Sequence, residues 1–136
     1  MSQVPEDPKA YNEQLIAQVR ADGFDPKRPM LLLTTTGARS GREHVTPVMF
    51  IPDGDDVLLV ASNNGAPSDP DWLRNLQATP KVGIEMPGGA FTGEAEVPQG
   101  ARRDELFGRI VEQYPFFAEH QQQTDRVIPV VVVHRP

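Results

Sequence analysis

Three absences narrow the classes of protein to which this chain can belong. Its 136 residues contain no cysteine, which excludes disulfide bonds, thiolate metal sites and a cysteine nucleophile. Lysine and arginine number 13 against 19 aspartates and glutamates, and the net charge of −6 argues against a general nucleic-acid-binding protein. No apolar run approaches the ~20 residues that cross a membrane.

The remaining composition fits one domain with a core that buries roughly two thirds of the unfolded surface. The segment 1–9 is polar and acidic, so we expect no signal peptide and a cytoplasmic protein. Three histidines, His44, His120 and His134, lack metal-ligand spacing, which predicts no metal site.

The most informative segment is an apolar, β-branched run, Leu31 to Thr36, that stops at the sequence Gly-Ala-Arg-Ser-Gly-Arg, residues 37–42. Such a run favours a strand, and glycine permits positive φ and a close approach of the main chain to a ligand. Arg39 and Arg42 add charge and Ser40 adds a hydroxyl. The segment predicts an anion-binding loop, although a hairpin turn with solvated arginines would have the same sequence.

Two glycine-rich phosphate motifs are excluded here. No Lys-Ser or Lys-Thr pair follows Gly41, and the three-glycine dinucleotide fingerprint is absent. Between Lys27 and His44, four basic residues stand against one acidic residue, which suits one small polyanion. A second apolar run, 57–62, ends in Asn-Asn-Gly-Ala-Pro, and the two strand ends could face one ligand.

The spacing of apolar residues and turn signals predicts mostly strands. We expect helices at Pro8–Ala21, Asp71–Ala78 and Gln99–Phe117, and strands at Met30–Thr36, His44–Ile51, Asp56–Ser62, Lys81–Met86, Ala90–Val97 and Ile128–His134. Asp69 or Asp71 is expected to cap the second helix, with Pro70 in its first turn, and the third helix to be the longest. This order suits a small antiparallel barrel rather than alternating βαβ units.

Several short motifs in a fixed order resemble the deazaflavin-dependent nitroreductase family, within the flavin/deazaflavin oxidoreductases of actinobacteria. They are Leu-Thr-Thr-Thr-Gly at 33–37, Arg-Ser-Gly at 39–41, Thr-Pro-Val at 46–48, Val-Ala-Ser at 60–62, Gly-Ala-Pro at 65–67, Pro-Asp-Trp at 70–72, Asn-Leu at 75–76, Ala-Thr-Pro at 78–80 and Thr-Asp-Arg at 124–126. The resemblance covers nearly the whole chain. It implies an α+β fold that is mainly β, an antiparallel, FMN-binding-like split β-barrel, forming one domain over 1–136 with an N-terminal helical cap at 1–23 and the barrel at 28–136.

The resemblance also implies a cofactor, coenzyme F-420 (8-hydroxy-5-deazaflavin), which is a polyanion with an apolar head. Its phosphate would be held by Arg39, Ser40 and the backbone of Gly41, and its glutamate tail by Arg42 and Lys27. Family members often carry basic residues where this chain has Ala38 and His44, and a histidine is largely neutral at pH 7. The other candidate cofactor-binding residues are Thr46, Pro47, Ala61, Ser62, Asn63, Gly65, Ala66, Trp72 and Asn75. Trp72 and Asn75 are one helical turn apart, so Trp72 can pack at the barrel mouth while Asn75 points toward the loop.

Reduced deazaflavin donates a hydride, so the protein needs to orient the reactants and polarise the acceptor. Ser62 Oγ or a nearby backbone N–H would stabilise the negative charge that develops on an acceptor oxygen. Tyr114 or His120 would deliver a proton. A structural interpretation of His120 is equally open, because a histidine near a helix C-terminus favours the helix dipole.

The segment 114–120 indicates which class of acceptor the protein would reduce. Relatives that activate nitroimidazole prodrugs present several tyrosines here, whereas this chain keeps Tyr114 and has Phe117 and His120 at the two other matching positions. We therefore expect planar conjugated acceptors, such as quinones, enones, coumarins or unsaturated lactones, and disfavour nitroimidazoles.

Other functions remain open at this stage. An FMN-binding split-barrel oxidoreductase would need the same anion-binding residues. A non-catalytic protein that binds deazaflavin, lipid or haem would have the same barrel. Asp125 and Arg126 are interpreted as an ion pair or a turn, and His134 as a surface residue. A monomer and a homodimer fit equally well, and any membrane contact would be peripheral.

Overall fold

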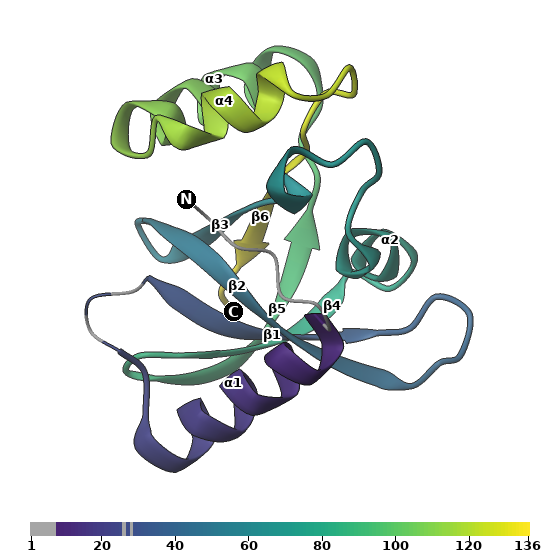
Figure 1. Cartoon of the computed structure of the whole chain (residues 1–136), viewed down its shortest axis with the longest axis vertical. Coiled ribbons are helices and arrows are strands. Elements are labelled where there is room, and N and C mark those ends of the chain that lie inside the picture. The colour runs from purple at the N-terminus through teal and green to yellow at the C-terminus, as the bar shows by residue number, and fades with distance from the viewer. Residues whose placement is uncertain (1–7, 26, 28) are drawn as a thin grey trace.

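Six antiparallel strands form a closed barrel in the computed structural model, which describes residues 8–25, 27 and 29–136 (Figure 1). The strand order around the barrel is β1-β2-β3-β6-β5-β4. The strands are β1 Met30–Thr36, β2 Glu43–Asp53, β3 Asp56–Val60, β4 Lys81–Met86, β5 Gly89–Glu96 and β6 Val130–His134. The helices are α1 Pro8–Asp22, α2 Asp71–Ala78, α3 Gly100–Gln113 and α4 Phe116–Gln122, with a 3-10 turn η1 at Asn63–Gly65. The antiparallel barrel expected from the sequence is confirmed.

The strands β3 and β6 are apolar on both faces because each faces two hydrophobic cores. Val57 and Leu59 of β3 point into the barrel, whereas Leu58 and Val60 join a second core outside it. The valines of β6 alternate in the same way. Side chains on a strand alternate between its faces, so a continuous apolar run marks a strand that is buried on both sides.

The helices cover different parts of the barrel. Trp72, Leu73 and Leu76 of α2 belong to the barrel core, so this helix closes one end of it. The second core is formed with α3 and α4, which lie together on the outside of the barrel (Figure 1). The remaining helix, α1, contacts β2.

The helix expected at Gln99–Phe117 is wrong in one respect, because the structure divides it into α3 and α4. The break lies at Tyr114 and Pro115. Proline disfavours the helical conformation of the residue before it, and Tyr114 accordingly has φ −133° and ψ 80°. The longest described helix is therefore α1, with 15 residues, rather than α3.

The expected cap of α2 is also wrong. Pro70 occupies the N-cap position and supplies no side-chain hydrogen bond, while Asp71 lies in the first turn, where its charge complements the helix dipole. Asp69 forms an ion pair with Arg126 instead. The expected bounds of β1 and β4 are confirmed, and the ends of the other strands differ from expectation by at most two residues. β6 begins at Val130, directly after Pro129, which has no N–H to donate.

His134 at the end of β6 joins three strands through its two ring nitrogens. Nε2 lies 2.8 Å from Glu96 of β5 and Nδ1 lies 3.2 Å from Asp56 of β3. The hydrogen bond to Glu96, followed by the charge of Asp56, raises the pKa of His134. Hydrogen bonds from His134 and Arg102 lower the pKa of Glu96.

These shifts predict a stability that depends on pH. Because the folded pKa of His134 is raised, its contribution is complete below the unfolded value near 6.5 and is lost as the pH rises through the folded pKa. The side chains are more than one third exposed, so we expect about 1 kcal/mol or less, or at most about 4 °C in Tm. Thermal unfolding of the wild type and His134→Asn between pH 6 and 9 measures this difference. Equal slopes for the two proteins would contradict it.

Candidate active site

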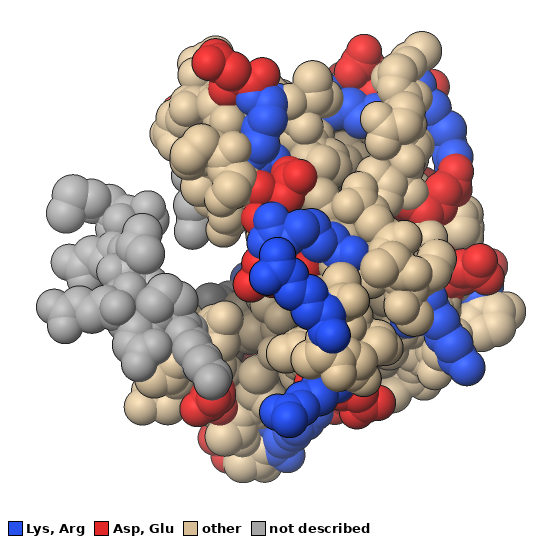
Figure 2. Space-filling view, turned by 90° about the vertical axis from the view of Figure 1, so that its right-hand side faces the viewer, with Lys and Arg blue, Asp and Glu red and all other residues tan. Residues whose placement is uncertain are grey.

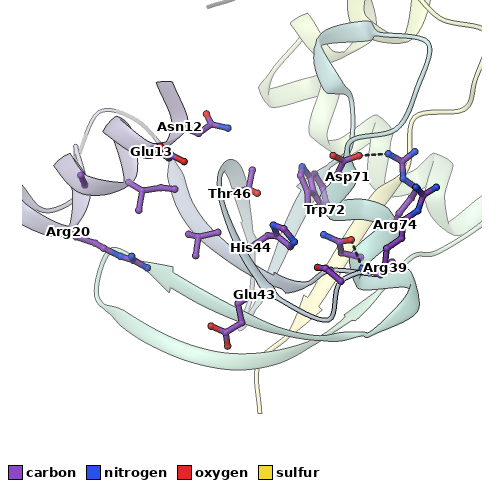
Figure 3. Close-up of a pocket in the computed structure, with 17 residues that line it drawn as sticks. Asn12, Glu13, Arg20, Arg39, Glu43, His44, Thr46, Asp71, Trp72 and Arg74 are labelled. Carbon is purple, nitrogen blue, oxygen red and sulfur yellow. Dashed lines mark hydrogen bonds and ion pairs between the residues drawn. The ribbon is translucent and has the colours of Figure 1, made fainter. Parts of the chain in front are cut away.

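Two cavities adjoin along β2. The larger has a volume of about 1380 Å³ and lies between α1 and α2 (Figure 3). The smaller has a volume of about 290 Å³ and reaches α4. Residues 43–46 of β2 line the larger cavity and residues 47–49 line the smaller one, while Trp72 lines both. The arrangement can hold one elongated ligand along β2 or two ligands that meet at Trp72.

The turn at residues 37–42 forms one wall of the larger cavity. It is closed by hydrogen bonds from Gly37 N to Arg42 O at 2.7 Å and from Gly41 N to Gly37 O at 2.9 Å. Gly41 has φ +70°, a conformation that favours glycine. A Cβ on Gly37 would lie 2.5 Å from Ser40 Oγ and 2.8 Å from His44 Nε2. The missing side chain therefore leaves room for two polar groups to converge at the cavity wall.

Asn75 of α2 fixes this turn to the barrel. Its Oδ1 accepts a hydrogen bond from Ala38 N at 3.0 Å, and its Nδ2 donates to Thr35 Oγ1 at 3.1 Å. Trp72, one helical turn earlier, is only 7% exposed and packs in the barrel core. The two residues on α2 thus point to different places, Trp72 into the barrel core and Asn75 toward the 37–42 turn.

The charges around the larger cavity are unevenly distributed. Neither Arg39 nor Arg42 forms an ion pair with any described residue, whereas Arg74 pairs with Asp71. The backbone N–H groups of residues 39 and 40 have no described partner either. Figure 3 places Arg39 and Arg74 beside α2, and Glu13 on the opposite side, on α1. Seen from the α2 side, basic side chains occupy the centre of the face beside acidic ones (Figure 2). The α2 side is therefore where an anion would bind.

The loop at residues 61–66 follows β3 and is held by Arg126. The guanidinium donates to the carbonyl oxygens of Ala61 at 3.1 Å, Ser62 at 2.7 Å and Ala66 at 3.0 Å. It also pairs with Asp69 at 2.8 Å. Of the two sequence-based interpretations of Asp125 and Arg126, the ion pair is corrected, because the partner of Arg126 is Asp69, 57 residues away in the chain. The chain bends at both residues.

The smaller cavity has mostly apolar walls. They are formed by Pro47, Val48, Met49, Val60, Pro70, Trp72, Phe116 and Phe117, with Ser62, Asn63 and His120 as the polar members. His120 Nδ1 is buried and has no hydrogen-bond partner among the described residues. Burial lowers the pKa of His120, so its imidazole is neutral near pH 7. Its ring meets those of Phe116 and Phe117 edge to face.

Most of the residues predicted from the sequence lie around these cavities. The larger one is lined by Arg39, Ser40, His44, Thr46, Trp72 and Asn75, and the smaller by Pro47, Ser62, Asn63, Trp72 and His120. Gly41, Arg42, Ala61, Gly65 and Ala66 belong to the same two loops but line neither cavity. Tyr114 also lines neither and packs against the outer core.

Sequence reasoning missed the contacts of Arg126 and the part that α1 has in the larger cavity, through Asn12, Glu13, Ile16, Ala17 and Arg20. Nothing local in the sequence indicates either, since both depend on distant segments. Among the described residues, no group of three or more His, Cys, Asp or Glu could hold a metal ion. None of the described helices is long and apolar enough to cross a membrane.

Replacing Asn75 tests the link between α2 and the turn. Asn75→Leu keeps the size of the side chain but removes both hydrogen bonds, one of them to the buried Thr35. We expect a loss of about 1–2 kcal/mol in the free energy of unfolding and faster amide exchange at Ala38. Denaturant unfolding and NMR-detected exchange measure these effects. Gln77→Leu, on the exposed side of α2, is the matched control, and equal exchange at Ala38 in both variants would contradict the link.

Comparison with known proteins agrees with this geometry. Residues 13–135 match the family model described as F420H(2)-dependent quinone reductase. An F420H(2)-dependent quinone reductase of Mycobacterium tuberculosis is 36% identical over 110 residues, which cover 79% of this chain and 74% of that protein.

Two solved structures share the fold at similar identity. One is an F420-H2-dependent reductase, FDR-A, with 37% identity and a TM-score of 0.71, over 79% of this chain and 95% of that one. The other, described as a domain-swapped dimer, has 34% identity and a TM-score of 0.74, over 93% and 96%. The chain therefore belongs to the F420H(2)-dependent quinone reductase family, and it is an oxidoreductase whose cofactor is coenzyme F-420.

Proposed function

We propose that the protein transfers a hydride from reduced coenzyme F-420, bound along the larger cavity, to a planar conjugated carbonyl compound in the smaller one. The observation that carries this proposal is the adjacency of the two cavities: a polar one with an unpaired arginine and an apolar one, which share Trp72. A polyanionic cofactor with an apolar ring system matches the first cavity and its junction with the second. A flat apolar acceptor matches the second.

The residues of the larger cavity fit the cofactor. Arg39 has no competing anion among the described residues, and the free N–H groups of the 37–42 turn add donors beside it. Charged guanidinium groups and backbone N–H groups together are well suited to phosphate. We assign the phosphate to the side chains and backbone N–H groups of Arg39 and Ser40, with His44 beside them. Gly41, whose own N–H donates to Gly37 O, contributes through the positive φ that closes the turn. The glutamate tail is assigned to the exposed Arg42 and Lys27.

The ring is assigned to the junction at Trp72, between β2 and the 61–66 loop. Thr46 and Pro47 supply the β2 side, and the opposite side consists of Ala61, Ser62, Asn63, Gly65 and Ala66. Asn75 contributes indirectly, because its side chain holds the 37–42 turn through the hydrogen bond from Ala38 N. When bound, the coenzyme supplies the hydride, so the chain itself needs neither a metal nor an acid-base dyad to generate the reductant.

The chain's own part is to orient the acceptor and stabilise its oxygen. Ser62 Oγ is the hydroxyl donor that faces the small cavity, and the neutral His120 is a second polar group there. We assign proton delivery to the imidazolium form of His120 rather than to Tyr114, since Tyr114 lines neither cavity. The imidazolium gives one proton to the reduced acceptor, becomes the neutral imidazole and takes up a proton from solvent before the next turnover. The aromatic walls at Phe116 and Phe117 make the surroundings of these groups less polar, which strengthens their polar interactions.

The same walls favour quinones, enones, coumarins and unsaturated lactones as acceptors over nitroimidazoles. A nitro group carries two polar oxygens, and the described cavity offers few donors in a volume of about 290 Å³. Phe117 stands where a hydroxyl donor would serve a nitro group.

The assembly and the domain organisation belong to the same proposal. Residues 1–136 are assigned to one functional domain with an N-terminal cap at 1–23 and the barrel at 28–136, of which residues 1–7 and 28 lie outside the described part of the chain. The part of α1 that is described supports this, because Asn12 and Ile16 line the larger cavity. The neighbour described as a domain-swapped dimer makes a homodimer the first alternative to a monomer.

Arg39→Ala tests the phosphate assignment. We expect the Kd for oxidised F-420 to rise about ten-fold or more, because a charge-assisted hydrogen bond contributes about 1.5–3 kcal/mol. Fluorescence titration at two salt concentrations measures it, and the salt dependence should weaken with the lost charge. Arg109→Ala, which removes an exposed ion pair with Asp53 far from the cavities, is the control. Unchanged affinity in Arg39→Ala would place the anion elsewhere.

The acceptor class is tested by absorbance of reduced F-420 mixed with menadione, an activated coumarin or a bicyclic nitroimidazole. We expect kcat/KM for menadione to exceed that for the nitroimidazole by about ten-fold or more, since a carbonyl acceptor needs fewer donors. Comparable values would contradict the acceptor assignment. Protein purified with bound flavin would favour an FMN enzyme, and binding of F-420 without reoxidation by any acceptor would favour a carrier.

A further inference from the structure

Arg126 has four acceptors and touches neither cavity as a lining residue, so the proposed reaction leaves its role unexplained. Its side chain is only 15% exposed, and its guanidinium contacts Ala61, Ser62, Ala66 and Asp69. The paired carboxylate of Asp69 neutralises its charge. An ion pair with Asp69 accounts for only one of these four contacts. The other three are hydrogen bonds to backbone carbonyl oxygens of a single loop.

The direction of those carbonyl groups fixes the direction of two N–H groups. In a trans peptide the C=O and the N–H point to opposite sides, and the described chain contains no cis peptide bond. The carbonyl groups of Ala61 and Ser62 point to Arg126. The N–H groups of the same two peptide units, which belong to Ser62 and Asn63, therefore point away from it. Neither N–H has a partner among the described residues, and both residues line the small cavity.

We infer that Arg126 is a positioning residue that holds the N–H groups of Ser62 and Asn63 as a paired donor for a carbonyl oxygen. This inference rests on the proposed function, since that oxygen belongs either to the acceptor or to the pyrimidine ring of the cofactor. The cationic guanidinium also polarises both peptide units, because hydrogen bonds in series strengthen one another. Backbone donors that are already in place stabilise an oxygen as it gains negative charge, because the donors do not have to reorganise during the reaction.

The geometry distinguishes this role from a purely electrostatic one. A lysine at position 126 would keep the charge, but one ammonium group cannot match the planar fork that reaches the carbonyl oxygens of Ala61 and Ser62 together. Both Arg126→Lys and Arg126→Gln should therefore release the loop. Asp69→Asn keeps an acceptor oxygen and the three carbonyl contacts, so it should have a smaller effect.

The donor itself can be removed at Ser62. This residue has φ −74°, which proline adopts, so Ser62→Pro deletes the N–H and keeps the φ of residue 62. Ser62→Ala deletes the hydroxyl and keeps the N–H. The difference between these two variants isolates the backbone donor from the side chain.

The experiment compares wild type, Arg126→Lys, Arg126→Gln, Ser62→Pro and Ser62→Ala, with Arg109→Gln as a folding control. For each folded variant we measure the Kd for oxidised F-420, the KM for menadione and the single-turnover rate of F420H(2) oxidation. We expect both Arg126 variants, and Ser62→Pro relative to Ser62→Ala, to lose about 100-fold in the single-turnover rate or in F-420 affinity, since deleting one such donor costs about 100- to 1000-fold. A loss in rate alone assigns the oxygen to the acceptor, and a loss in F-420 affinity assigns it to the cofactor.

Several results would overturn the inference. If Arg126→Lys keeps the wild-type rate and F-420 affinity, only the charge at position 126 matters. If Ser62→Pro and Ser62→Ala have the same rate and affinity, the backbone N–H pair has no role as a donor. If both Arg126 variants unfold, the Ser62 comparison decides alone. A wild type that binds F-420 but reduces no acceptor would instead refute the proposed function, and the affinity measurements would still test the donor pair.

Discussion

The burial of β3 and β6 on both faces is the constraint on which the rest of the structure depends. Leu59 faces the barrel core and Leu58 faces α3 and α4, so the two cores are built from opposite sides of the same strands. The segments that leave these strands are fixed by the same packing. One is the loop at 61–66 and the other contains Arg126, and their approach at the end of the β3–β6 pair lets one guanidinium reach three carbonyl groups.

The polar and the apolar parts of the site lie beside different residues of β2. Its first residues border a polar cavity with an uncompensated arginine, and its middle residues border an apolar cavity that α4 completes. Trp72 belongs to both walls while its ring stays in the barrel core. The helix that closes the barrel therefore also sets the point at which the two cavities meet, and Asn75 connects the 37–42 turn to that same helix.

Sequence reasoning predicted what depends on local pattern. The antiparallel barrel, the limits of β1 and α2 and the two loops followed from β-branched runs, glycines and prolines, and the family resemblance added the cofactor. The end of α3 was misjudged because apolar periodicity continues through Tyr114, although Pro115 disfavours a helical residue before it. The partners of Arg126 and the contribution of α1 to the larger cavity could not be predicted, since they depend on segments that meet only after the barrel closes.

The break at Pro115 has a consequence for how this site can change over time. It separates α3, whose Leu106 and Ile110 hold the outer core, from α4, which presents Phe117 and His120 to the small cavity. Phe117 belongs to the outer core as well, whereas Phe116 and His120 line the small cavity from outside that core. Substitutions at these two positions can alter the shape of the small cavity with little effect on α3 or on the arginine-bearing turn. Under the proposed function, acceptor preference can therefore diverge among descendants of one ancestral barrel while the turn assigned to the cofactor is inherited unchanged.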